Sequence, residues 1–379
     1  MLAEHGDPSQ DVATAAVLFL VDAKLVLLQP SANEYGELKY DMRVIAHDVE
    51  FYTLTREQPT AALATLEATP NPVLMNGNAG QGLRDSLWYF NGAAVHVWPE
   101  ILDVLSSAPT ELERDIPSPV AIPTDFYPLS FMVDKGIITG VEPDLVQRRD
   151  VDFSFFRFSS RTHLFIPALL RHHLVQYDSS AALHLSHYYR KLSYFSHSLE
   201  ILLHNVLDEE VDASPESAEM ALLPSVLSFL SSFPAYLDIV AGCTRKTEMR
   251  SWRTLFNHLP PVQSLFEESL NKGLLKTAGS YLLILHAFEE DSFNTQQIAT
   301  LLTRAKDAGD WELCKELSRF LVGIDASGAL LKTVIASAGL RTGGHSNGVS
   351  TSIDAVGKID HGDQAGGDYF VPKAVAQRP

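Results

Sequence analysis

Residues 294–325 read NTQQIATLLTRAKDAGDWELCKELSRFLVGID, and this stretch contains the start and stop signals of two helices. Thr295 can cap the first helix, and Gly309 can follow its end in the left-handed conformation that glycine tolerates. Asp310 can cap the second helix. Its apolar residues recur at i, i+4 and i+7, as Leu313, Leu317 and Phe320. Because the turn between them is short, the two helices should lie antiparallel and adjacent.

The same signals extend from this pair in both directions. Downstream, Gly323 should end the second helix and Asp325 should cap another that runs through Ser337. Upstream, further helices should begin near Pro167, Ser179 or Ser180, Tyr194, Pro224, Pro234 and Pro260, and one should cover residues 274–290. Successive antiparallel helix pairs predict an α-solenoid, although no strict repeat period is present. A compact all-α bundle is the alternative.

The first part of the chain has the pattern of strands. Val17 to Val21, a turn at residues 22–24, and Leu25 to Leu28 predict a hairpin that Pro30 should end. Asn91-Gly92 lies between two apolar runs, which is a strong hairpin signal. Residues 134–136 (DKG) predict a third hairpin, and residues 41–55 predict another strand pair.

Repeated hairpins of this kind are typical of β-propeller blades or of sandwich layers. Three unrelated hairpins are the alternative. The proline-rich residues 107–128 predict a long connection between blades. Because a propeller typically needs at least four blades, either a sheet edge stays open or further blades precede Met1.

Composition narrows the class of function. The 379 residues carry a formal net charge of −18, which disfavours a broad surface for nucleic acid or anionic lipid. The two cysteines, Cys243 and Cys314, are too few for a disulfide framework or a zinc finger. Acidic residues precede the apolar residues 12–30, and Asp22 and Lys24 interrupt them, so we expect no signal peptide, no transmembrane helix and a cytosolic protein.

Residues 183–210 hold four histidines and raise the question of a metal or catalytic site. His184 and His187 share one helix face at i, i+3, but a zinc site needs further ligands and a second shell. The apolar stripe of the helix that begins near Tyr194 should contain Phe195, Leu199, Leu202 and Val206. His197, Glu200 and His204 share the opposite face, without the i, i+4 spacing of a metalloprotease. We therefore expect the histidines to pack at helix–helix seams, and we predict no metal, cofactor or catalytic residues.

Other chemical patterns are weak. The glycine-rich residues 76–82 (NGNAGQG) lack the order of a dinucleotide fingerprint and the Lys-Ser/Thr of a P-loop, which favours a flexible insertion. His172-His173 points two rings to different sides of a helix. The aromatic residues of YYRKLSYF (188–195) should be core, and the basic Arg245, Lys246 and Arg250 form too small a group to indicate a ligand. The acids of residues 208–212 should form a solvated turn after a helix, with an acidic docking surface as the alternative.

Three long helical stretches resemble the C-terminal domain of the ribosome control protein family: residues 161–212, 255–290 and 310–322. The hairpin LFLVDAKLVLLQP (18–30) is similar to the last propeller blades of the same family. The resemblance spans about residues 5 to 340. It implies terminal blades of a β-propeller at 1–158 and an α-solenoid at 159–340. Residues 341–379 lie outside the resemblance, and we expect them to be a disordered tail because they are rich in Gly, Ser and Asp and poor in apolar residues. The resemblance also implies further propeller before Met1, so the chain looks like a fragment or a truncated gene model.

The resemblance carries an expectation about function. Family members are large subunits of a two-subunit guanine-nucleotide exchange factor for the Golgi Rab GTPase of the Rab-six class, called Ypt-six in yeast. Their smaller partner is arrestin-like, and the complex supports retrograde endosome-to-Golgi transport from the cytosolic face of the Golgi as a peripheral membrane protein. Because propellers joined to solenoids also build vesicle coats and tethers, a structural scaffold without exchange activity is the alternative. A metal-dependent hydrolase built on the histidines is a third and weaker alternative.

Overall fold

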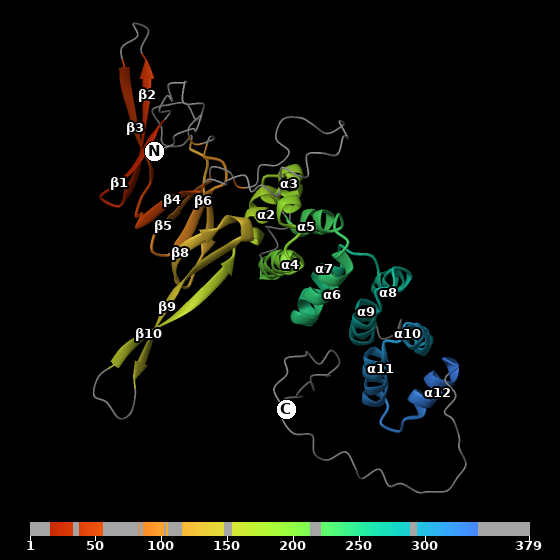
Figure 1. Ribbon diagram of the computed structural model, residues 1–379. Helices are drawn as coiled ribbons and strands as arrows, with labels where there is room; N and C mark the ends of the chain where they lie inside the picture. Colours follow the sequence, from red (N-terminus) through yellow and green to blue (C-terminus); the bar gives the residue numbers. More distant parts are fainter. Residues whose placement is uncertain are drawn as a thin grey trace. The chain divides into compact units, whose positions relative to one another are not determined.

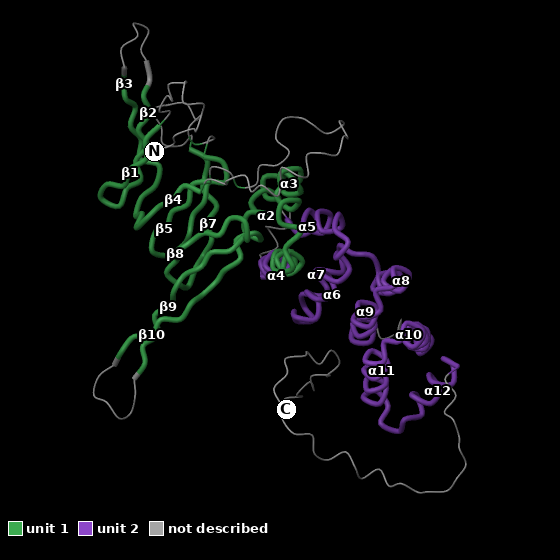
Figure 2. Tube along the Cα trace, in the orientation of Figure 1, with its two compact units in different colours: residues 1–202 green, residues 203–379 purple. Residues whose placement is uncertain are grey.

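The computed structural model describes residues 16–32, 38–55, 83, 86–101, 104, 116–147, 154–212, 221–288 and 294–339. Strands precede helices along the chain, as Figure 1 shows. The chain divides into two compact units at residues 202 and 203, within one helix, and Figure 2 colours them separately. The loop 76–82 and the tail 341–379 lie outside the described residues.

The first sheet has the order β1-β2-β3, formed by Val17–Val21, Lys24–Ala32 and Leu38–Ala46. The predicted hairpin joins β1 to β2, but its turn has two residues and not three, because Asp22 and Ala23 have positive φ and Lys24 already pairs with Val21. The prediction that Pro30 ends the strand is wrong, since β2 continues and Pro30 pairs with Tyr40. β1 pairs with β2 only as far as Leu28, so no residue of β1 lies beside Pro30. The amide hydrogen that proline lacks is therefore not needed for pairing with β1.

The second sheet has the order β4-β5-β6-β7, formed by Phe51–Thr55, Ser86–Phe90, Ala94–Trp98 and Val120–Pro123. The predicted Asn91-Gly92 hairpin joins β5 to β6, with positive φ at Gly92. The strands predicted in residues 41–55 exist, but β3 and β4 belong to different sheets. The prediction of a connection over residues 107–128 is wrong in its second half, because β7 pairs with β6 there.

The third sheet has the order β10-β9-β8, formed by Ser154–Leu164, Ile137–Gln147 and Tyr127–Met132. The predicted turn between β8 and β9 contains a short 3-10 helix at Val133–Lys135, followed by Gly136 with positive φ. β8 pairs with β9 only as far as Val141. Beyond that residue, β9 and β10 continue as a two-stranded ribbon.

Sheet β4–β7 has residues of β5 buried on both of its faces. Leu87 and Tyr89 belong to one core cluster with residues of β1, β2 and β3. Trp88 on the opposite side stacks on Phe131 of β8, with ring centroids 4.8 Å apart. All five residues of β5 are therefore buried, which explains why residues 87–90 are continuously apolar and do not alternate with polar residues.

The helices begin directly after β10. α2 (Ile166–Val175) carries Pro167 in its first turn, where a missing amide costs nothing. α3 (Ser179–Tyr189) is capped by Asp178, not by the predicted Ser179 or Ser180, because the Asp178 carboxylate accepts from the Ala181 amide. α4 (Phe195–Asp212), α5 (Leu223–Leu230) and α6 (Tyr236–Lys246) follow near the predicted positions. α7 (Met249–Phe256) was not predicted.

The later helices are α8 (Val262–Asn271), α9 (Leu275–Phe288), α10 (Thr295–Asp307), α11 (Trp311–Ile324) and α12 (Ala329–Ser337). Asp310 caps α11 and Gly309 has positive φ, both as predicted. Asn294 and not Thr295 caps α10, through a capping box with Gln297. Gly323 does not end α11, which continues to Ile324. The Asp325 carboxylate accepts from the Leu330 amide in the first turn of α12, close to the predicted cap.

The predicted order of propeller-like strands followed by a solenoid of helices is confirmed, and the described sheets do not close into a ring. Consecutive helices pack in pairs, including α2 with α3, α8 with α9, and α10 with α11. The last strand runs to Leu164, beyond the boundary at residue 158 that the sequence suggested. The division into domains stays a prediction.

Candidate protein-interaction surfaces

His184 and His187 lie on an exposed face of α3. The opposite face of that helix is buried through Ala182, Leu185 and Tyr189. Burial lowers the pKa of His187, and the neighbouring charges of Arg190, His184 and Lys191 lower it further. The two rings therefore sit in an exposed, locally cationic environment. The expectation that they pack at a helix–helix seam is wrong, because the apolar stripe of α3 leaves them on the solvent side.

The histidines of α4 make local ion-pair contacts. His197 Nδ1 lies 3.6 Å from Glu200 Oε2, and His204 Nδ1 lies 3.1 Å from Asp208 Oδ2. His197 is exposed, so seam packing is also wrong for this residue. The buried stripe of α4 is the predicted one and contains Phe195, Leu199, Leu202 and Val206. In the part of the chain that the structure describes, no three His, Cys, Asp or Glu side chains are grouped so that they could hold a metal ion.

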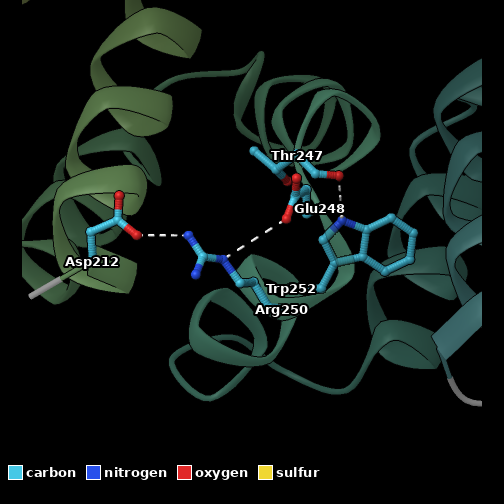
Figure 3. A network of polar contacts seen from close by, with 5 residues as sticks. All are labelled: Asp212, Thr247, Glu248, Arg250 and Trp252. Atoms are coloured by element: carbon cyan, nitrogen blue, oxygen red, sulfur yellow. Dashed lines mark hydrogen bonds and ion pairs between the residues drawn. The ribbon is translucent and has the colours of Figure 1, made fainter.

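The acidic residues 208–212 extend α4 by more than a turn, which corrects the prediction that they form a turn after the helix. Their carboxylates have specific partners. Glu210 Oε1 accepts from the Leu223 amide at 2.6 Å, where α5 begins. Asp212 Oδ1 lies 2.6 Å from Nη2 of Arg250, a residue of the group that the sequence left without a role (Figure 3).

Arg250 is the centre of the polar network drawn in Figure 3. Its Nε lies 3.9 Å from Glu248 Oε2, while Trp252 donates from Nε1 to the Thr247 carbonyl at 3.2 Å. The network joins the end of α4 to the start of α7, and α5 and α6 lie between these two segments in the chain. Because the Arg250 and Asp212 side chains are mostly exposed, their ion pair should contribute little to stability.

Only some of the aromatic side chains in residues 188–195 belong to the core. Tyr189 and Phe195 are buried, whereas Tyr188 and Tyr194 are half-buried. Tyr189 donates to the Val133 carbonyl at 2.7 Å, and Tyr194 donates to the Lys135 carbonyl at 2.7 Å. These hydroxyls hold the β8–β9 turn against α3 and the start of α4. His172 and His173 on α2 lie with their rings 5.6 Å apart and nearly perpendicular, consistent with two different directions from the helix.

A half-buried histidine lies within the second sheet, where the sequence gave no reason to expect one. The His96 ring of β6 stacks on Tyr89 of β5, with centroids 4.7 Å apart and planes within 9°. Neither His96 ring nitrogen has a hydrogen-bond partner among the described residues. Burial lowers the pKa of His96 and raises that of Tyr89 to about 12. Both rings are therefore neutral near pH 7.

Large apolar side chains are exposed on the ribbon of β9 and β10. Leu145 is opposite Phe156, and Pro143 is opposite Phe158, so all four share one side of the ribbon. The exposed fractions of Leu145, Phe156 and Phe158 are 61%, 66% and 67%. We call this set the ribbon face. In the sequence, Phe156 and Phe158 alternate with polar residues, and this alternation is the signal that could have indicated the ribbon face.

Comparison with known proteins adds the family relationship. A model described as the RIC1 second beta propeller domain matches residues 1–161, and one described as the RIC1 C-terminal alpha solenoid region matches residues 167–340. A guanine nucleotide exchange factor subunit of Caenorhabditis elegans is 32% identical over 257 residues, which are 65% of this chain and 17% of that protein. The human guanine nucleotide exchange factor subunit RIC1 is 32% identical over 256 residues, 64% of this chain and 18% of that protein.

A more distant relative covers more of the chain. The guanine nucleotide exchange factor subunit ric1 of Schizosaccharomyces pombe is 22% identical over 390 residues, which include 86% of this chain and 35% of that protein. The chain thus spans less than a fifth of the animal relatives and about a third of the yeast one. No described helix is both long enough and apolar enough to cross a membrane.

Proposed function

This chain belongs to the RIC1 family, and from that premise we propose that it serves as a scaffold subunit of a guanine-nucleotide exchange factor for a Golgi Rab GTPase of the Rab-six class. The observation that carries the proposal is the order of the two matches. A RIC1 propeller region is followed directly by the RIC1 solenoid region in one chain, and relatives at 32% identity are named exchange factor subunits.

We place the protein in a complex with a smaller arrestin-like subunit, at the cytosolic face of the Golgi and as a peripheral membrane protein. In that position the complex would support retrograde endosome-to-Golgi transport. The names of the relatives support membership of a multi-subunit exchange factor. The identity of the GTPase, the partner and the organelle is inferred from the family resemblance of residues 161–212 and 255–290.

Exchange can proceed through binding alone. A factor that binds the nucleotide-free GTPase more tightly than the nucleotide-bound form weakens nucleotide affinity by the same ratio, because the two binding equilibria are linked. The protein then needs surfaces that hold the switch loops away from the nucleotide and its magnesium ion, and no acid, base or metal of its own. Exposed helix faces are available for contacts of this kind.

The test is nucleotide release. The 379-residue chain and the smaller subunit of the same organism are purified together, and release of fluorescent GDP from the Golgi Rab is followed with excess unlabelled GTP. A Rab of another organelle is the specificity control, and the complex of a full-length relative is the positive control. We expect the chain to co-purify with the smaller subunit and to accelerate release from the Golgi Rab only.

Two outcomes would change the conclusion. If the chain binds the smaller subunit but leaves the release rate unchanged while the full-length relative accelerates it, the structural scaffold without exchange activity becomes the better description. If the chain binds neither the smaller subunit nor the Golgi Rab, the proposal of an exchange complex is contradicted for these 379 residues.

A further inference from the structure

Strand β10 forms a long, open edge of its sheet. The order β10-β9-β8 leaves one side of β10 without a strand among the described residues. Its eleven residues, Ser154–Leu164, contain no proline, and their register with β9 is uninterrupted. Proteins usually protect such edges with short strands, prolines or bulges, because an open edge can pair with another strand.

The second sheet, β4–β7, has a protected edge. Its edge strand β7 has four residues and ends in Pro123. In the sheet of β10 itself, the opposite edge strand, β8, contains Pro128 next to a shift in its register with β9. Moreover, sheet β4–β7 has four strands and sheet β8–β10 has three. In chain order β10 is the third strand of its sheet, as β6 is of the second sheet. β6 pairs with a fourth strand, β7, whereas β10 has no such partner among the described residues.

The two sides of the ribbon differ in chemistry. The ribbon face carries Pro143, Leu145, Phe156 and Phe158, all exposed. On the other side Arg157 lies opposite Asp144, and Arg161 Nη2 makes an ion pair with Glu142 Oε2 at 2.5 Å. A two-stranded ribbon with one exposed apolar side is marginal by itself and is stabilised when another element covers it.

Charge selects the kind of segment that fits. β10 contains Arg157 and Arg161 and no acidic residue, in a chain with a formal net charge of −18. Arg157 is exposed and makes no ion pair among the described residues. A strand added beside β10 would place alternate side chains next to Phe156 and Phe158 on one side and next to Arg157 and Arg161 on the other.

We propose that β10 is a docking strand, to which an extended segment of a partner protein adds as a fourth strand, with apolar residues toward the ribbon face and acidic residues toward Arg157 and Arg161. The assignment of that partner as the second subunit of the exchange complex rests on the proposed function, whereas the docking strand itself does not. Main-chain hydrogen bonds would supply affinity, and the alternation of side chains would supply specificity.

The experiment uses the 379-residue chain and synthetic peptides as probes. A fluorescent peptide that alternates valine and glutamate is compared with one that alternates valine and lysine, and with a peptide in which the valines and glutamates form two blocks. We expect the alternating acidic peptide to bind best. Hydrogen–deuterium exchange should then slow at β10 amides and stay unchanged at β8 amides, because only β10 gains a hydrogen-bonded neighbour.

Variants separate charge from apolar contact. Arg157→Glu should weaken binding of the acidic peptide about tenfold or more and strengthen binding of the lysine peptide, since like charges across an interface are costly. Phe156→Ser with Phe158→Ser should weaken both peptides. The matched controls are Arg190→Glu and Tyr177→Ser, which change an exposed arginine and an exposed aromatic residue elsewhere. Circular dichroism checks that each variant is folded.

The proposal is overturned if the three peptides bind equally, if Arg157→Glu does not reverse the charge preference, or if binding leaves β10 amides unprotected. It is also overturned if the chain alone forms dimers that Phe158→Ser dissociates, since a second copy then occupies the edge. None of these results depends on nucleotide release, so failure of the docking strand and failure of the exchange function can be told apart.

Discussion

The strands of residues 16–164 and the helices of residues 166–339 build their cores in different ways. Strand β5 is buried because residues of β1–β3 contact one of its sides and Phe131 and Phe165 contact the other, so its environment comes from distant parts of the sequence. Helices pack mainly on near neighbours, such as α8 on α9 and α10 on α11. The removal of one long-range contact should therefore destabilise the strand region, whereas the helical region should tolerate single local substitutions.

The largest expected effect is the removal of Trp88. Its side chain is fully buried, lies within 4.9 Å of the Phe165 ring centroid and donates from Nε1 to Ser86 Oγ at 2.8 Å. Trp88→Ala should reduce the free energy of unfolding of the strand region by about 3–5 kcal/mol, because it leaves a large cavity. Urea unfolding combined with hydrogen–deuterium exchange can assign the loss to β4–β6 and β8.

Trp311→Ala is the matched control in the helical region. This tryptophan is 66% exposed at the start of α11. Its replacement should change the free energy of unfolding by less than about 0.5 kcal/mol. Equal effects of the two substitutions would contradict the claim that the core of the strand region depends on Trp88.

The next largest difference in stability is expected between alanine substitutions at two turn glycines. Gly136 and Gly309 both have positive φ. A methyl group at Gly136 would collide with the Ile166 side chain, whereas nothing lies within 4 Å of one at Gly309. Gly136→Ala should therefore cost about 2–4 kcal/mol, from backbone strain and overpacking together, and Gly309→Ala about 1 kcal/mol from strain alone.

Thermal denaturation of the two alanine variants is the measurement. An additional variant, Gly136→Ala with Ile166→Val, removes one methyl group from the neighbouring side chain and should recover part of the loss. If Gly136→Ala and Gly309→Ala have the same effect, the packing of the β8–β9 turn against α2 adds nothing to the cost of the substitution at Gly136.

These glycines also show what the sequence could predict. Turns and caps depend on residues close in the chain, so the turns at 22–24, 91–92 and 134–136 and the cap at Asp310 were predictable. Strand partners depend on distant residues, so the assignment of β3 and β4 to different sheets was not. Helix periodicity identified the buried stripe of α4 but not that the histidines of α3 face solvent. The alternation of Phe156 and Phe158 with polar residues is a local pattern, but their pairing with Leu145 and Pro143 depends on the register with β9, which no local pattern fixes.

A smaller effect should appear on acidification. Burial lowers the pKa of His96 in the folded state below its unfolded value, so between those two values the unfolded chain binds more protons. Stability of the strand region should then be full above about pH 6.5 and should fall as the pH decreases below that value. Burial also lowers the pKa of His163, His172 and His173, which contribute in the same direction.

His96→Phe isolates the contribution of His96. The phenyl ring can retain the stack on Tyr89 and cannot take up a proton. Urea unfolding at about pH 7.5 and about pH 5.5 should give a smaller difference for this variant than for the natural chain. His258→Phe, at an exposed position in the helical region, is the control and should leave the difference unchanged. An unchanged pH difference in His96→Phe would show that His96 protonation is not coupled to unfolding.

The smallest effect concerns the contact of Arg250 with Asp212 in the helical region. It joins residues far apart in the sequence, yet both side chains are mostly exposed. A double-mutant cycle with Arg250→Gln and Asp212→Asn should give a coupling of about 0.2–1 kcal/mol. The coupling should decrease in about 1 M salt, where screening acts over roughly 3 Å. A salt-insensitive coupling well above this range would mean that the helical region also depends on single long-range contacts, and the contrast with β5 would then be lost.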